Sequence, residues 1–77
     1  MKPIPKHGYA IVIETTRTGF SCYAPDLPGC VASAKTRKQL EKLMAEAIAL
    51  HIESLQRHGN PVPEPTSVVD YVEPAVA

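Results

Sequence analysis

The sequence predicts an α+β protein with the element order β-β-β-α-β, in which one long helix packs on one face of an antiparallel sheet of three to four strands. Three observations lead to this prediction. Three short strand-like runs precede residue 35, helical periodicity spans residues 37–58, and a further strand-like run follows a proline-rich connection. Seventy-seven residues have room for a single domain.

The first two strands are expected at residues 9–14 and 19–24, joined by a polar hairpin loop that ends in glycine. The first is rich in β-branched residues and is largely apolar on both faces. We therefore predict that it lies centrally in the sheet or is covered on its second side. The alternation places one apolar face on each strand: Tyr9, Ile11 and Ile13 on the first, Phe20, Cys22 and Ala24 on the second.

A turn with the sequence Ala-Pro-Asp-Leu-Pro-Gly-Cys, residues 24–30, joins the second strand to the third. Its two prolines restrict the backbone, and Gly29 can adopt the positive φ at which the chain turns. We predict a rigid connection that presents Asp26 and Leu27 at its tip. The third strand, residues 30–34, carries small side chains that allow a helix to pack closely.

The helix is predicted to begin after Thr36, which serves as N-cap with Gln39 at the capping-box spacing. Arg57 and His58 suit its negative C-terminal end, and Gly59 follows as C′. Leu50 and Ile52 flank its apolar stripe on opposite sides. The stripe itself is formed by Leu40, Leu43, Met44, Ala47, Ile48, His51 and Leu55.

The remaining segments are connections and one further strand. Residues 1–8 form an extended lead-in, residues 60–67 a proline-rich connection, and residues 73–77 a frayed tail. Residues 67–72, which lie between the proline-rich connection and the tail, are expected to form a strand. This strand would pair with the sheet of its own chain or with that of another subunit. We expect one domain over residues 1–77, without a separate DNA-binding domain.

The distribution of charge along the chain indicates which class of partner it can bind. The chain has no formal net charge, but residues 1–40 carry six basic and two acidic residues, whereas residues 60–77 carry three acidic and no basic residues. Because phosphate contacts dominate nucleic-acid affinity, we do not expect direct DNA binding by this chain alone. An acidic tail suits a basic protein partner. No apolar run is long enough for a membrane span, and two cysteines without a framework suggest the cytoplasm.

The sequence contains no catalytic cluster, and we predict no catalytic, cofactor-binding or metal-ligating residue. The histidines and cysteines lack zinc-site spacing, and Cys22 and Cys30 read as buried free thiols in preference to a disulfide. A hydrolase that used Cys22 and His51 would need an accessible thiolate and an oxyanion-binding site, and the sequence contains no pattern that indicates either. A metal-dependent nuclease would need converging carboxylates, whereas residues 1–40 hold only two acids.

Six residues are candidates for contact with a protein partner. Asp26 is the only carboxylate of the central turn, where its alternative role is to accept hydrogen bonds from nearby backbone N–H groups. As a set, the apolar candidates exceed what so small a fold can cover in one subunit. The candidates are Tyr23, Asp26, Leu27, Leu50, Ile52 and Tyr71.

The order of these segments resembles the HicB-like antitoxin family. The resemblance rests first on the strand before residue 15 and on the sequence from Gly19 to Cys30. It rests further on the helix after Thr36 and on the segment Gly-Asn-Pro-Val-Pro-Glu-Pro at residues 59–65. The resemblance implies a partial ribonuclease-H-like fold and a non-enzymatic protein that binds and masks a small, basic, RNA-cleaving toxin of the HicA type. It also implies a homo-oligomer, a dimer or tetramer.

The sequence departs from the family pattern in two places, at residues 33–35 and at Gln39-Leu40, which bears on partner specificity. Only about a dozen residues follow the proline-rich segment, where relatives often carry a DNA-binding module. The alternative interpretation is a structural or regulatory homo-oligomer without a toxin. A third is an enzyme, either a thiol hydrolase or a degenerate nuclease.

Overall fold

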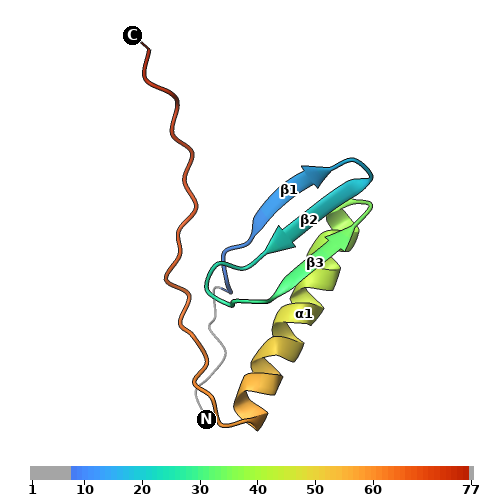
Figure 1. The fold of residues 1–77 in the computed structure, drawn as a ribbon, viewed down its shortest axis with the longest axis vertical. Coiled ribbons are helices and arrows are strands. Elements are labelled where there is room, and N and C mark those ends of the chain that lie inside the picture. The colour runs from blue at the N-terminus through green and yellow to red at the C-terminus, as the bar shows by residue number, and fades with distance from the viewer. Residues whose placement is uncertain (1–7, 77) are drawn as a thin grey trace.

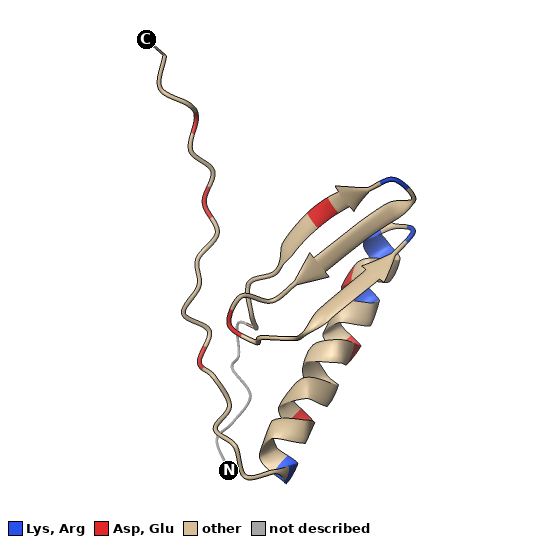
Figure 2. Cartoon of the chain, in the orientation of Figure 1, with Lys and Arg blue, Asp and Glu red and all other residues tan. Residues whose placement is uncertain are grey.

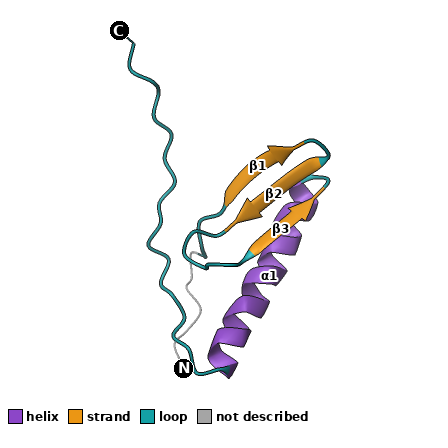
Figure 3. Cartoon of the chain, in the orientation of Figure 1, coloured by secondary structure: helices purple, strands orange, loops and turns teal. Residues whose placement is uncertain are grey.

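The computed structural model describes residues 8–76 and shows a three-stranded antiparallel sheet with one helix packed on it (Figure 1). The elements are β1 (Val12–Thr16), β2 (Gly19–Tyr23), β3 (Val31–Ala34) and α1 (Arg37–Arg57). An extended segment without helix or strand follows the helix (Figure 3). The predicted α+β class and the order of the first four elements are confirmed. Residues 1–7 of the predicted lead-in lie outside the described residues.

The sheet has the order β1-β2-β3, so β2 is the central strand. Ile13 pairs with Cys22, and Cys22 pairs with Ala32, which places these three side chains in one row on the face that packs against the helix. The predicted inner faces of the first two strands are therefore confirmed. Of the two alternatives predicted for the first strand, the central position is not found, because β1 pairs with β2 and with no other strand within residues 8–76.

Two consecutive tight turns form the connection between β2 and β3. The N–H of Leu27 donates to the carbonyl of Ala24 at 3.0 Å, and the N–H of Cys30 donates to the carbonyl of Leu27 at 3.0 Å. Pro28 and Gly29 are the central residues of the second turn, and φ of Gly29 is +85°. Proline followed by a residue with positive φ is the pattern of a type II turn. The predicted turn, with Gly29 at positive φ, is confirmed.

Thr36 begins the helix as predicted. Its backbone is extended, with φ −127° and ψ 157°, and its Oγ1 accepts a hydrogen bond from the N–H of Gln39 at 3.1 Å. This bond satisfies one of the N–H groups that a helix leaves without an intrahelical partner. No acidic residue occupies the first turn, so the cap, and not a favourable charge, marks the start of α1.

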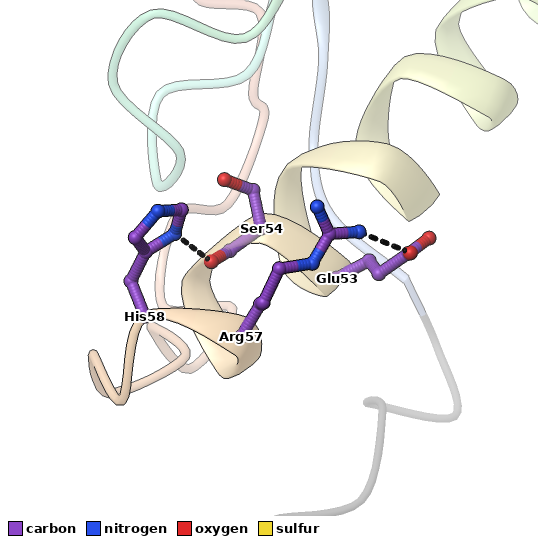
Figure 4. Close-up of polar contacts among 4 residues, drawn as sticks. All are labelled: Glu53, Ser54, Arg57 and His58. Atoms are coloured by element: carbon purple, nitrogen blue, oxygen red, sulfur yellow. Dashed lines mark hydrogen bonds and ion pairs between the residues drawn. The ribbon is translucent and has the colours of Figure 1, made fainter.

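The C-terminal end of α1 carries a full set of capping bonds. The N–H of Gly59 donates to the carbonyl of Gln56, and the N–H of Asn60 donates to the carbonyl of Leu55, which together make a Schellman motif. His58 Nδ1 lies 2.8 Å from the Ser54 carbonyl, and Arg57 lies 2.7 Å from Glu53 (Figure 4). That ion pair is exposed and stabilises the helix little.

The helix packs on β3 and β2 and does not extend under β1. Its buried side chains are Leu40, Met44 and Ile52, and Ile48 packs at the edge of the core. Six of the seven residues of the predicted stripe are buried or half-buried, and Ile52, which was predicted to flank the stripe, is buried as well. Leu43, predicted within the stripe, is instead 44% exposed.

The fourth strand, predicted at residues 67–72, does not form among the described residues. After the helix, the chain runs back past the end of the sheet and continues as an extended tail well beyond it (Figure 1). The alternating sequence of this segment favours a strand, but a strand is stable only when its backbone pairs with a neighbour. No helix within residues 8–76 combines the length and apolar character needed to cross a bilayer.

Candidate partner-binding surface

The Asp26 carboxylate holds the segment that returns from the helix. It accepts hydrogen bonds from the N–H and hydroxyl of Thr66, both at 3.1 Å, and from the N–H and hydroxyl of Ser67, both at 2.9 Å. One carboxylate thus accepts hydrogen bonds from four donors on two adjacent residues, as the carboxylate of a helix N-cap accepts bonds from backbone N–H groups. Asp26 therefore fixes the base of the C-terminal tail to the central turn.

These hydrogen bonds change the acidity of the carboxyl group. The pKa of Asp26 is lowered from its ordinary value, first by the bond from the Ser67 N–H and then by the other three donors, and partial burial only partly opposes this. Donors that point at a carboxylate favour its charged form. Asp26, which we predicted as a contact for a partner's cationic group, therefore already accepts hydrogen bonds from its own chain.

A second contact holds the same returning segment. The hydroxyl of Tyr9 donates to the carbonyl of Pro63 at 2.6 Å, across 54 residues of sequence. Burial raises the pKa of Tyr9, and the nearby carboxylates of Glu64 and Asp26 raise it further, so the phenol stays protonated and remains a donor. Val62, one residue before Pro63, is buried. Residues 62–67 are therefore docked, and the free tail begins after Ser67.

The six predicted contact residues divide between surface and interior. Tyr23, Leu50 and Tyr71 expose 43%, 66% and 92% of their surface. Leu27 is fully buried in the core, not presented at the tip of the turn, because the two consecutive turns direct its side chain inward. Ile52 is also buried, although it is not part of the core cluster that contains Leu40 and Met44.

The structure adds exposed apolar residues that the sequence did not single out. Val31 on β3 is 63% exposed and pairs with Tyr23, which in turn pairs with Val12. These three side chains form an apolar row on the face of the sheet away from the helix. Pairing across strands creates this row, so sequence alternation within one strand could not reveal it. We call Val12, Tyr23 and Val31 the outer row.

Charges are separated along the molecule. Basic residues lie in the β1–β2 hairpin and near the start of α1, whereas acidic residues are spaced along the segment after the helix (Figure 2). The tail is therefore both acidic and apolar. It carries the acidic residues Asp70 and Glu73, and Glu64 lies in the docked segment before it. The exposed apolar residues of the tail are Val68, Val69, Tyr71, Val72 and Val76.

The two cysteines are buried free thiols, as predicted. Burial raises the pKa of Cys22, and burial together with the neighbouring Cys22 raises the pKa of Cys30. A raised pKa keeps the thiol protonated and opposes nucleophilic use. Within residues 8–76, no three histidine, cysteine or acidic side chains lie close enough together to hold a metal ion.

A comparison with protein families matches residues 9–75 to the HicB-like antitoxin of bacterial toxin-antitoxin systems. The chain belongs to the HicB-like antitoxin family. The match includes the central turn, the helix and most of the tail, so the features that organise this HicB-like protein lie within the family's common region.

Two relatives agree with this assignment. The UPF0150 protein Ta0767 of Thermoplasma acidophilum is 36% identical over 56 residues, which cover 71% of this chain and 81% of that protein. A chain in the solved structure of the HicA3 and HicB3 toxin-antitoxin complex is 40% identical, with a TM-score of 0.68 over 78% of this chain and 70% of that one. The partial ribonuclease-H-like classification stays a prediction.

Proposed function

We propose that this HicB-like protein is a non-enzymatic antitoxin that binds and masks a small, basic, RNA-cleaving toxin of the HicA type. The observation that carries the proposal is the likeness, at 40% identity, to a chain of a solved toxin-antitoxin complex. The acidic tail supports it, because opposite charge speeds the encounter with a basic protein. We place this action in the cytoplasm, through protein contact and without DNA contact by this chain.

The outer row is the toxin-facing surface that we propose. Tyr23 and Val31 are exposed apolar side chains at paired positions, and aromatic residues of this kind are enriched in protein interfaces. Leu50, on the exposed side of the helix, and Tyr71, in the tail, remain further candidates. We do not propose Leu27 and Ile52 as contacts, because both are buried in this chain.

Co-expression with the protein encoded next to it tests the proposal. The expected result is a complex that is retained in pull-down and a rescue of growth when the toxin is induced. Tyr23→Glu should weaken the complex roughly tenfold or more, as loss of an interface anchor does. Thr18→Glu is the matched control, because it adds the same charge at the hairpin tip, at the other end of β2.

Two results would count against the proposal. A neighbouring protein that neither binds nor is neutralised removes the antitoxin function. In that case the alternative of a structural or regulatory homo-oligomer without a toxin remains. Equal weakening by Tyr23→Glu and Thr18→Glu would keep the function but remove the outer row as its surface.

A further inference from the structure

Four basic residues lie at the end of the molecule where the β1–β2 hairpin meets the start of α1 (Figure 2). Gly19, just after the hairpin tip, shows how close the two parts are, because a Cβ at this position would lie 2.8 Å from the Cα of Lys35. The hairpin therefore abuts the connection from β3 to α1, and segments apart in sequence share one surface. We call this surface the cationic end, and its basic residues are Arg17, Lys35, Arg37 and Lys38.

The chain does not neutralise these charges by ion pairs of its own. All four residues are exposed, and the one ion pair among residues 8–76 joins Arg57 to Glu53 at the other end of α1. The first turn of the helix contains no acidic residue. Asp70 of the tail borders the same groove as Arg37, but the two side chains form no ion pair. The cationic end is therefore available to an anion from outside the chain.

The position of these charges does not favour the stability of the helix. The N-terminal end of a helix carries partial positive charge, so acidic side chains are favoured there and basic ones are disfavoured. Arg37 and Lys38 occupy the first two positions of α1, and Lys35 lies two residues before it. Neighbouring charges of the same sign also repel one another. A bound anion would offset both unfavourable effects.

The residues around these charges indicate phosphate as the anion. Thr16 and Thr18 are exposed on either side of Arg17, and arginine, lysine and threonine are all side chains that contact phosphate oxygens in nucleic-acid complexes. An interface with an acidic protein would be expected to have an apolar core. The large exposed apolar side chains of the described chain lie elsewhere, on the outer row, farther along α1 and in the tail.

We propose that the cationic end binds the phosphate backbone of single-stranded RNA. The surface is a small corner formed by a hairpin tip, a connection and the start of a helix, so a flexible single strand can bend around it, whereas a stiff duplex meets it at fewer phosphates. Backbone contacts carry no sequence information, so binding should not depend on the sequence of the RNA. The choice of RNA over DNA rests on the proposed function, which involves no DNA contact by this chain.

Titration of the purified chain with a fluorescent oligouridylate is the first test. For a single strand, the logarithm of the affinity falls by about 0.7 per phosphate contact for each tenfold rise in salt. Four contacts therefore predict a slope of about −3 and a loss of affinity of roughly 50-fold between about 50 and 200 mM salt. In NMR spectra, the amide resonances of residues 16–18 and 35–38 should shift when RNA is added. No binding at low salt overturns the proposal, and so do shifts confined to other residues.

Arg37→Glu and Arg57→Glu form a matched pair, because each reverses the charge of one exposed arginine, at the two ends of α1. Arg37→Glu should weaken RNA binding about fivefold or more and reduce the salt slope by about 0.7. It should not lower Tm, because glutamate is favoured in the first turn of a helix. Arg57→Glu should leave the affinity within about twofold, since charges farther apart than about 10 Å are screened at 0.1 M salt. Equal weakening by both variants would show that net charge alone governs binding, which overturns the proposal.

Two other polyanions identify the class of partner. Polyglutamate with the same number of charges should bind severalfold more weakly than RNA, and equal binding would assign the surface to acidic proteins. Tighter binding of duplex DNA with the same number of phosphates would assign it to DNA. Either result overturns the proposal. These titrations use the chain alone, so a chain that binds a toxin but not RNA removes only this inference, and one that binds RNA but no toxin removes only the proposed function.

Discussion

The Ser67 N–H donates to the Asp26 carboxylate at 2.9 Å, which connects the central turn to a residue 41 positions later in the chain. The same carboxylate accepts three further bonds from Thr66 and Ser67. These bonds hold the base of the tail against the central turn.

Replacement of Asp26 by alanine should release the base of the tail. Because all four acceptor contacts disappear while the side chain contributes nothing to the core, we expect the helix and sheet to persist. Amide hydrogen exchange at residues 66 and 67 should become severalfold faster, with exchange in the middle of α1 unchanged. Glu14→Ala is the matched control, since it removes an exposed carboxylate of β1 that accepts no described hydrogen bond. Unchanged exchange at Ser67 would show that Asp26 does not hold the tail.

The anchor should also depend on pH in a defined direction. The hydrogen bonds lower the pKa of Asp26 below its ordinary value of 3.8, so their stabilisation is complete above that value and is lost as the pH falls through the lowered pKa. The Ser67 amide resonance, followed by NMR from neutral to strongly acid pH, should shift in a transition below 3.8. In Asp26→Asn this transition should be absent. A transition above 3.8 would contradict the stabilising role of these bonds.

Leu27→Ala should destabilise the fold strongly. Leu27 is fully buried, and truncation of a buried leucine costs about 2–5 kcal/mol through lost transfer energy and the cavity that remains. Thermal unfolding should show a fall in Tm of roughly 4–8 °C for each kcal/mol in a domain of this size. The control is Leu50→Ala, the same change at a residue that is 66% exposed, for which we expect less than about 0.5 kcal/mol. Similar losses in both variants would contradict the burial assigned to Leu27.

Gly19→Ala tests the close approach of β2 to the end of β3. A Cβ at this position would overlap the carbonyl oxygen of Ala34 and lie 2.8 Å from the Cα of Lys35, and both neighbours are backbone atoms that move only with the strand. We expect a loss of about 1–3 kcal/mol or more, measured by denaturant unfolding. Thr18→Ala, one residue earlier in the exposed hairpin, should change stability by less than about 0.5 kcal/mol.

The local elements of this fold could be predicted from the sequence because their determinants are close together in the chain. Thr36 and Gln39 are three residues apart, and the prolines and Gly29 of the central turn act on their own backbone angles. The faces of the strands that pack against the helix follow from the alternation of side chains between the two faces of a strand. Three of the six candidate contacts, Tyr23, Leu50 and Tyr71, are exposed, and their binding role stays a prediction.

Several features could not be predicted, because they join distant residues. The burial of Ile52 and the exposure of Leu43 depend on how the helix packs in the folded chain. The contacts from Asp26 to Ser67 and from Tyr9 to Pro63 span 41 and 54 residues. No local pattern marks such pairs, since a carboxylate or phenol suits any donor or acceptor that the fold brings near.

The order of three strands and one helix, the central turn and the resemblance to a family follow from the amino-acid sequence, because propensity, capping and turn chemistry act over a few residues. The exposure of individual side chains, the edge position of β1 and the absence of a pairing partner for residues 67–72 among the described residues depend on the tertiary structure. Strand pairing and burial are properties of surfaces that meet, and such surfaces exist only after the chain has folded.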